Sequence, residues 1–254
     1  MRILRMLTAA LLAVTAVLYI GNGLYTRLSG REVGPVIECP EEVLEISIYD
    51  GTQALLTGVT ARDDQDGDLT DRVMVGGVSK LIGGDRAKVT CMVFDSDDNM
   101  ASLVRQVRYT DYRRPRISLR APLVFASEKE AKLLEQVEVT DVLDGDLSGK
   151  ARVSTLWATE DEGVYSATVL VTNSMGDTAM VDVPVLIGRS GGGIRLRQQV
   201  IYLQQGDAFD PETALASDAT GVQIHSEVDT AEDGCYWVRY SRGDALAILT
   251  VVVE

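Results

Sequence analysis

The chain has 254 residues, of which 46% are hydrophobic and 24% charged, so it can bury a core and is not a disordered chain. Its 38 acidic residues outnumber the 24 lysines and arginines, and the net charge of −14 together with the lack of a basic run excludes nucleic acid as a favoured partner. One histidine and three cysteines are too few for a histidine-based metal site or a cysteine-rich zinc cluster.

The N-terminal segment, residues 1–27, reads as a signal anchor. It begins with Arg2 and Arg5, and residues 6–25 then carry no charge, a stretch long enough as a helix to cross about 30 Å of hydrocarbon. A cleaved signal peptide has the same basic start and apolar centre and is the alternative. Because no small-x-small cleavage signal closes the apolar run, we expect one uncleaved transmembrane helix that makes the membrane a partner through residues 6–25. The protein would then be a single-pass protein of the cell membrane with its C-terminal domains extracellular.

The rest of the chain shows short apolar runs with period-two alternation, separated by Gly, Asp, Asn and Pro, which predicts an all-β fold. Asp-Gly-Asp-Leu at residues 66–69 recurs at residues 144–147, 78 positions later. Val-Phe-Asp-Ser at residues 93–96 recurs as Val-Thr-Asn-Ser at residues 171–174 with the same spacing. Two distant landmarks with one spacing indicate that a whole domain is duplicated.

The junctions give the boundaries of three repeats. We expect a first repeat at residues 35–111, a second at 115–187, a Gly-rich linker at 188–193 and a third repeat at 194–254. The third repeat lacks the Asp-Gly-Asp landmark and is shortened in its middle. A linker of this composition behaves as flexible coil, so the third repeat is expected to reorient freely.

The opening Pro-x-Ile, the Asp-Gly-Asp-Leu in mid-repeat, the Gly-x-Tyr strand and the Asp/Asn-Ser turn together resemble the bacterial surface Ig-like domains that occur in tandem on exported proteins. The resemblance covers residues 35–254 and is weaker in the third repeat. It implies three tandem Ig-like antiparallel β-sandwiches, preceded here by the N-terminal transmembrane helix. It also implies a role in display, spacing or adhesion, and it does not imply catalysis.

The densest acidic cluster contains Asp63, Asp64, Asp66 and Asp68. Calcium, which takes six to eight oxygen ligands in irregular geometry, is the one cofactor this cluster suggests. The position of Gly67 and the absence of a Glu at the twelfth position exclude an EF-hand loop. The alternative is a turn in which the aspartates accept backbone N–H bonds and Gly67 adopts positive φ.

Two further sites involve cysteines and aromatic residues. Cys39 and Cys91 could form a disulfide in an exported chain, or Cys91 could be a free thiol in the core; Cys235 is either inert or available for an intermolecular bond. Trp237 and Arg239 fall on the solvent side of a predicted strand, so they either contact a glycan or protein partner or pack against a neighbouring loop.

The function expected from these observations is that of a membrane-anchored, non-enzymatic bacterial cell-surface or envelope protein. Its repeats would mediate adhesion by binding an unknown surface protein or glycan. A structural spacer or accessory subunit of a membrane-envelope complex is the alternative. Lone His225, without a recognisable nucleophile motif, gives no support for an enzyme.

Overall fold

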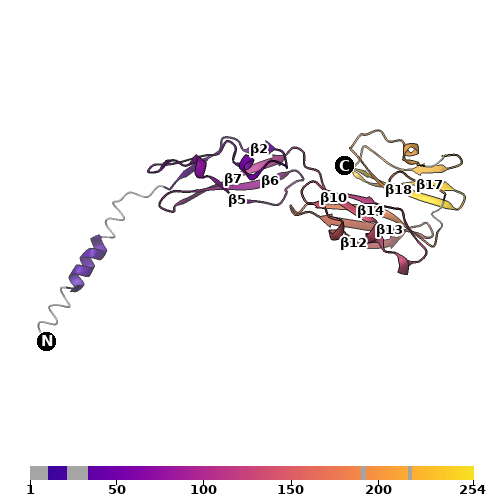
Figure 1. The fold of residues 1–254 in the computed structure, drawn as a ribbon, viewed down its shortest axis with the longest axis horizontal. Coiled ribbons are helices and arrows are strands. Elements are labelled where there is room, and N and C mark those ends of the chain that lie inside the picture. The colour runs from indigo at the N-terminus through magenta and orange to yellow at the C-terminus, as the bar shows by residue number, and fades with distance from the viewer. Residues whose placement is uncertain (1–10, 22–33, 190–192, 217–218) are drawn as a thin grey trace, which may run out of the picture. The chain divides into compact units, whose positions relative to one another are not determined.

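A computed structural model describes residues 11–21, 34–189, 193–216 and 219–254 (Figure 1). Residues 11–21 are helical. Among the described residues no helix is long and apolar enough to cross a membrane, so the structure does not show the expected transmembrane helix. Residues 6–10 and 22–25 of the predicted span lie outside the described residues.

The first repeat contains two sheets, as the alternating sequence predicts. The smaller sheet has the order β1 (Val36–Glu38), β3 (Thr60–Asp63), β4 (Gly67–Asp68), and the larger has the order β2 (Val43–Ile46), β7 (Met100–Tyr109), β6 (Arg86–Phe94), β5 (Met74–Val78). Short 3-10 helices lie at η1 (Thr52–Leu56) and η2 (Thr70–Arg72). Alternate residues of β6, among them Val89, Cys91 and Val93, are fully buried, because successive side chains of a strand point to opposite faces.

The second repeat has the same arrangement, which is the structural counterpart of the 78-residue duplication. Its smaller sheet is β11 (Gly145–Asp146), β10 (Val137–Asp141), β8 (Arg116–Leu119), and its larger sheet is β12 (Arg152–Ala158), β13 (Val164–Thr172), β14 (Thr178–Ile187), β9 (Leu123–Phe125), with β9 parallel to β14. Its 3-10 helices are η3 (Glu128–Glu130), η4 (Leu133–Gln136) and η5 (Ser148–Lys150). One core takes side chains from both sheets, including Ile117 and Val139 from one and Val169 and Val183 from the other. This repeat is therefore a β-sandwich.

The third repeat differs from the expected two-sheet sandwich. Its described residues form one four-stranded sheet, β15 (Val200–Leu203), β18 (Ala245–Val253), β17 (Gly234–Arg242), β16 (Gln223–Ser226), with η6 (Pro211–Ala214) beside it. In place of a second sheet, a single bridge joins Leu196 to Leu215. The third repeat lacks the Asp-Gly-Asp landmark, which supplies the edge strands β4 and β11 in the other two repeats, so it has no counterpart of those strands.

The third repeat packs against the second, contrary to the expected free reorientation. The chain divides into two compact units, and residues 107–254 fall in one of them. Val200 of β15 belongs to the buried core of the second repeat, and Leu246 and Ile248 of β18 form a small buried cluster with Val164 and Leu186. Apolar contact of this kind stabilises the packed arrangement of the two repeats whatever the composition of the linker. Residues 190–192 of the linker lie outside the described residues.

Candidate binding site at the seam between the second and third repeats

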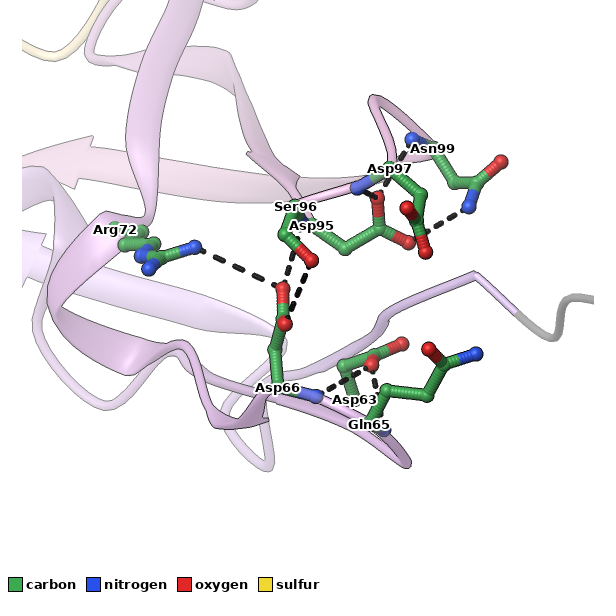
Figure 2. Close-up of polar contacts among 8 residues, drawn as sticks. All are labelled: Asp63, Gln65, Asp66, Arg72, Asp95, Ser96, Asp97 and Asn99. Carbon is green, nitrogen blue, oxygen red and sulfur yellow. Dashed lines mark hydrogen bonds and ion pairs between the residues drawn. The ribbon is translucent and has the colours of Figure 1, made fainter.

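The acidic landmark of the first repeat links two loops through hydrogen bonds (Figure 2). Asp66 accepts hydrogen bonds from the backbone N–H of Ser96 at 2.6 Å and from its hydroxyl at 2.8 Å. Asp144 and Ser174 repeat both bonds in the second repeat, each at 2.7 Å. The two landmarks found in the sequence are therefore partners in space.

The neighbouring aspartates close tight turns. Asp63 accepts the backbone N–H groups of Gln65 and Asp66, and Asp68 accepts that of Thr70. Hydrogen bonds from the side chain and backbone of Thr70 lower the pKa of Asp68. Gly67 has a φ of 78°, which L side chains rarely adopt, so the turn requires glycine at this position.

The structure does not bring the four predicted calcium ligands together as a metal site. Asp63, Asp66 and Asp68 each accept backbone hydrogen bonds, and Asp64 is exposed. Over the part of the chain that the structure describes, no group of three or more His, Cys, Asp or Glu side chains is placed to hold a metal ion. The observed geometry is that of the alternative, hydrogen-bonded turns.

No disulfide joins Cys39, Cys91 or Cys235 in the structure. Cys91 is buried and faces the core, as its place in the strand predicts, while Cys39 is half-buried and donates to the carbonyl of Glu41. A Cys39–Cys91 disulfide stays a prediction. Cys235 is exposed as a residue, but its thiol donates to the carbonyl of Asp182 in the second repeat at 3.5 Å, and desolvation of the sulfur there raises the pKa of the thiol to about 11.

Trp237 and Arg239 both face the second repeat. The indole N–H of Trp237 donates to the Asp182 carbonyl at 2.9 Å, and its ring packs on the buried cluster between the repeats. Arg239 forms an ion pair of 2.9 Å with Asp161. These contacts within the chain explain why Trp237 and Arg239 occupy this face of β17. A contact of either residue with an external partner stays a prediction.

A second set of contacts joins the repeats through β15. The hydroxyl of Tyr202 donates to the Ile117 carbonyl at 3.0 Å and accepts the Ile117 N–H at 2.8 Å. Burial raises the pKa of Tyr202 to about 12. The guanidinium of Arg116 lies 4.8 Å from the centre of the Tyr202 ring and pairs with Glu254 at 2.9 Å. Two polar contact sets therefore accompany the apolar seam.

A groove of about 400 Å³ lies along this seam and is called the seam groove below. One wall is formed by residues 119–124, which run from the end of β8 through the turn into β9, and the other is the segment 194–199 that precedes β15. Leu186 from the second repeat and Leu246 and Ile248 from the third also line it. Its volume lies within the range of small-ligand sites. The seam groove exists only where both repeats contribute, and the sequence did not single out its residues.

Comparison with known proteins gives no family. No protein-family model and no curated protein sequence matches the chain. Among solved structures, the CBM51-2 and INT domains of Clostridium perfringens ZmpB, determined with GlcNAc, match 59% of this chain and 27% of that chain at 16% identity and a TM-score of 0.25. A lipoprotein from Bacteroides thetaiotaomicron matches 85% of this chain and 98% of that chain at 11% identity and a TM-score of 0.22.

The human Desmocollin-1 ectodomain matches 86% of this chain and 61% of that chain at 13% identity and a TM-score of 0.19. TM-scores this low do not indicate a shared overall fold. These likenesses therefore do not indicate what this chain binds.

Proposed function

We propose that the chain is a non-enzymatic protein of the cell envelope, held at the membrane by residues 6–25, whose repeats bind a partner through the seam groove. The observation that carries this proposal is a groove of about 400 Å³ whose two walls come from different repeats. Burial of Val200, Leu246 and Ile248 keeps those walls together without a ligand. A preformed concave site lowers the cost of ordering on binding.

Site-specific photo-crosslinking in the cells that make the protein tests this function. Gln198 lines the groove and is exposed, and Gln223 is an exposed glutamine on β16 that does not line it. A benzophenone amino acid at position 198 should give a crosslinked product that the same group at position 223 does not. Equal crosslinking at both positions, or none at 198, would argue against a groove partner.

A structural spacer is the second candidate, favoured by the contacts of Trp237, Arg239 and Tyr202 that fix the third repeat on the second. Filling the groove through Ala121→Trp separates the two candidates, because a spacer tolerates that change and a groove-dependent binder does not. Ala121 is half-buried in the groove wall, so a larger side chain there occupies the groove without removing a charge.

The membrane anchor is tested by the N-terminal sequence of protein extracted from membranes. Retention of residues 6–25 is expected from the uninterrupted apolar run without a cleavage signal. A mature N-terminus near residue 23 would show that the segment is a cleaved signal peptide.

A further inference from the structure

The C-terminal strand β18 has an open edge along the seam groove. Of its nine residues, only the last four, Thr250 to Val253, pair with β15. The chain that precedes β15 does not continue this pairing, because residues 195–197 bond to residues 214–216 instead. Residues 245–249 therefore pair with β17 along one edge, and along the other edge no described segment pairs with them.

The backbone groups of Leu246 and Ile248 point toward this open edge. The N–H of Thr250 donates to the Gln199 carbonyl at 3.0 Å, so the backbone of Thr250 faces the β15 side. Alternate residues of a strand turn their backbone groups to the same neighbour, so the N–H and carbonyl groups of Leu246 and Ile248 face that side as well. Both residues line the groove, and none of the described residues hydrogen-bonds to these groups. The groove therefore contains an unpaired row of strand donors and acceptors.

The second repeat shows how an edge of this kind is occupied. Gly188, just after β14, and Glu254, just after β18, donate their N–H groups in the same way to the parallel strand beside them. Asp182 and Ile248 precede them by the same number of residues and are therefore equivalent. The Asp182 carbonyl accepts hydrogen bonds from three side chains of the third repeat, among them Trp237 at 2.9 Å. The equivalent edge at Ile248 has no such occupant among the described residues, and it continues the contact between the two repeats.

Aliphatic side chains surround the open edge. Leu123, Val124 and Leu186 line the groove from the second repeat, and Ile194 and Leu196 line it from the third. Successive side chains of an added strand would point to opposite faces, so alternate ones would reach these apolar walls. The open edge spans about 17 Å at the spacing of residues in a strand, which matches a segment of about five residues.

We propose that the seam groove binds an extended segment of a partner protein, which adds to the open edge of β18 as a β-strand through the backbone of Leu246 and Ile248. This inference deepens the proposed function and rests on it. Strand addition gives affinity through main-chain hydrogen bonds, and the groove walls select aliphatic side chains at alternate positions of the segment. A sugar or an acyl chain does not repeat N–H and carbonyl groups at strand spacing, so the open edge favours a peptide.

Selection from a displayed library of random heptapeptides tests the occupant. The full chain, solubilised in detergent, serves as the target, and the Ala121→Trp variant, whose groove is filled, serves for counter-selection. The selected peptides should carry Val, Ile or Leu at alternate positions. Peptides without this alternation, or no enrichment over the counter-selection, would overturn the proposal.

N-methylation of a selected peptide, one backbone nitrogen at a time, tests the strand pairing. Each methyl group replaces one N–H donor and blocks the approach to a strand edge. Methylation at two alternate positions should weaken binding about tenfold or more, because those N–H groups face β18. Methylation at the position between them should change the affinity by no more than about threefold. Similar losses at consecutive positions, or no loss at any position, would contradict strand addition.

Position 248 of the protein gives a matched pair of variants. Ile248→Pro and Ile248→Ala both lose the buried aliphatic side chain, but only the proline also loses the N–H that faces the groove. Proline is tolerated in a strand where its nitrogen faces away from the ladder. The selected peptide should bind the proline variant about tenfold more weakly than the alanine variant, and equal affinities would contradict the pairing. Circular dichroism shows whether each variant is folded; if the proline variant is not, the N-methylation series on the parent protein decides.

An N-acetylglucosamine tetramer and a fatty acid are tested in parallel on the parent protein and on Ala121→Trp. Binding of either that Ala121→Trp abolishes, with no peptide selected, would replace the peptide as the occupant. Crosslinking at position 198 without an alternating effect of N-methylation would overturn strand addition and leave the binding function standing, so the two failures are distinguishable.

Discussion

At the scale of single residues, comparison of the two duplicated repeats shows that the first has a buried arginine where the second has a buried valine. Arg105 lies 78 positions before Val183, at the same place in β7 as the valine in β14, and both side chains are buried. Its Nη1 donates to the Thr57 carbonyl at 2.5 Å, whereas Nε and Nη2 have no hydrogen-bond partner. The carboxylate of Glu41 lies 3.8 Å from Nη2 and is itself exposed. A buried charge with so little compensation contributes little to stability.

Replacing Arg105 with Met should therefore leave the free energy of unfolding unchanged or raise it by about 1 kcal/mol. The apolar chain fills a similar volume and removes two buried nitrogens that have no hydrogen-bond partner, which offsets the loss of the bond to Thr57. Hydrogen exchange of the β6 amides, followed by mass spectrometry, measures the local free energy. A loss of about 3 kcal/mol would show that the guanidinium has a stabilising partner in solution.

The hydrogen bonds that Asp144 accepts from Ser174 make the stability of the second repeat decrease in acid. Hydrogen bonds from the hydroxyl and the N–H of Ser174 lower the pKa of Asp144 below its ordinary 3.8. A carboxylate with a depressed folded pKa stabilises the fold above its unfolded pKa, and this contribution is lost as pH falls through 3.8 toward the folded pKa.

Asp144→Asn should therefore destabilise the protein at pH 7 by about 1 kcal/mol and have a smaller effect at pH 3. Urea unfolding monitored by circular dichroism at both pH values measures the difference. An equal loss at the two pH values would mean that the charge of Asp144 does not contribute.

At the scale of elements, β18 is buried on both faces. Leu249, Val251 and Val253 face the core of the third repeat, and Leu246 and Ile248 face the second. Residues 245–253 are apolar except for Thr250, which reflects this burial, because a strand covered on both sides does not alternate. That run indicates a covered strand but not what covers it.

The sequence accordingly predicted local features better than the pairing of repeats. The strands, the burial of alternate residues such as Val238 and Tyr240 on β17, and the turn at Gly67 follow from alternation and glycine chemistry. The seam depends on contacts between residues far apart in the chain, such as Trp237 with Asp182, which a single sequence does not encode visibly. The composition of the linker suggested that the third repeat reorients freely. Linker composition carries no information about the apolar surfaces that the second and third repeats bury against each other, and those surfaces decide the outcome.

The rate at which the Cys235 thiol reacts measures whether the second and third repeats stay in contact. Its pKa of about 11 and its bond to Asp182 predict slow reaction with a disulfide reagent at pH 8, since the thiolate is the reactive form. In a Cys39→Ser, Cys91→Val background, Trp237→Ala should increase that rate by about tenfold or more, because separation of the repeats removes the contact with Asp182 and the desolvation of the sulfur that raises its pKa. Trp157→Ala, which removes an exposed tryptophan on β12, is the control. Equal rates in both variants would contradict the role of Trp237.

At the scale of the whole molecule, the account depends on the second and third repeats behaving as one body. The seam groove, the internal placement of Trp237 and Arg239, and the burial of Val200 all require it. Binding by the groove and spacing by a stiff arm are both lost if the repeats separate.

The most direct measurement is the distance distribution between nitroxide labels on the exposed residues Lys132 and Glu212, each changed to Cys in a Cys39→Ser, Cys91→Val, Cys235→Ser background. Ser at position 235 keeps a donor for the Asp182 carbonyl. Double electron–electron resonance on the full chain in detergent should give one narrow distribution that broadens in Trp237→Ala. A broad distribution in the parent protein, unchanged by Trp237→Ala, would contradict the account.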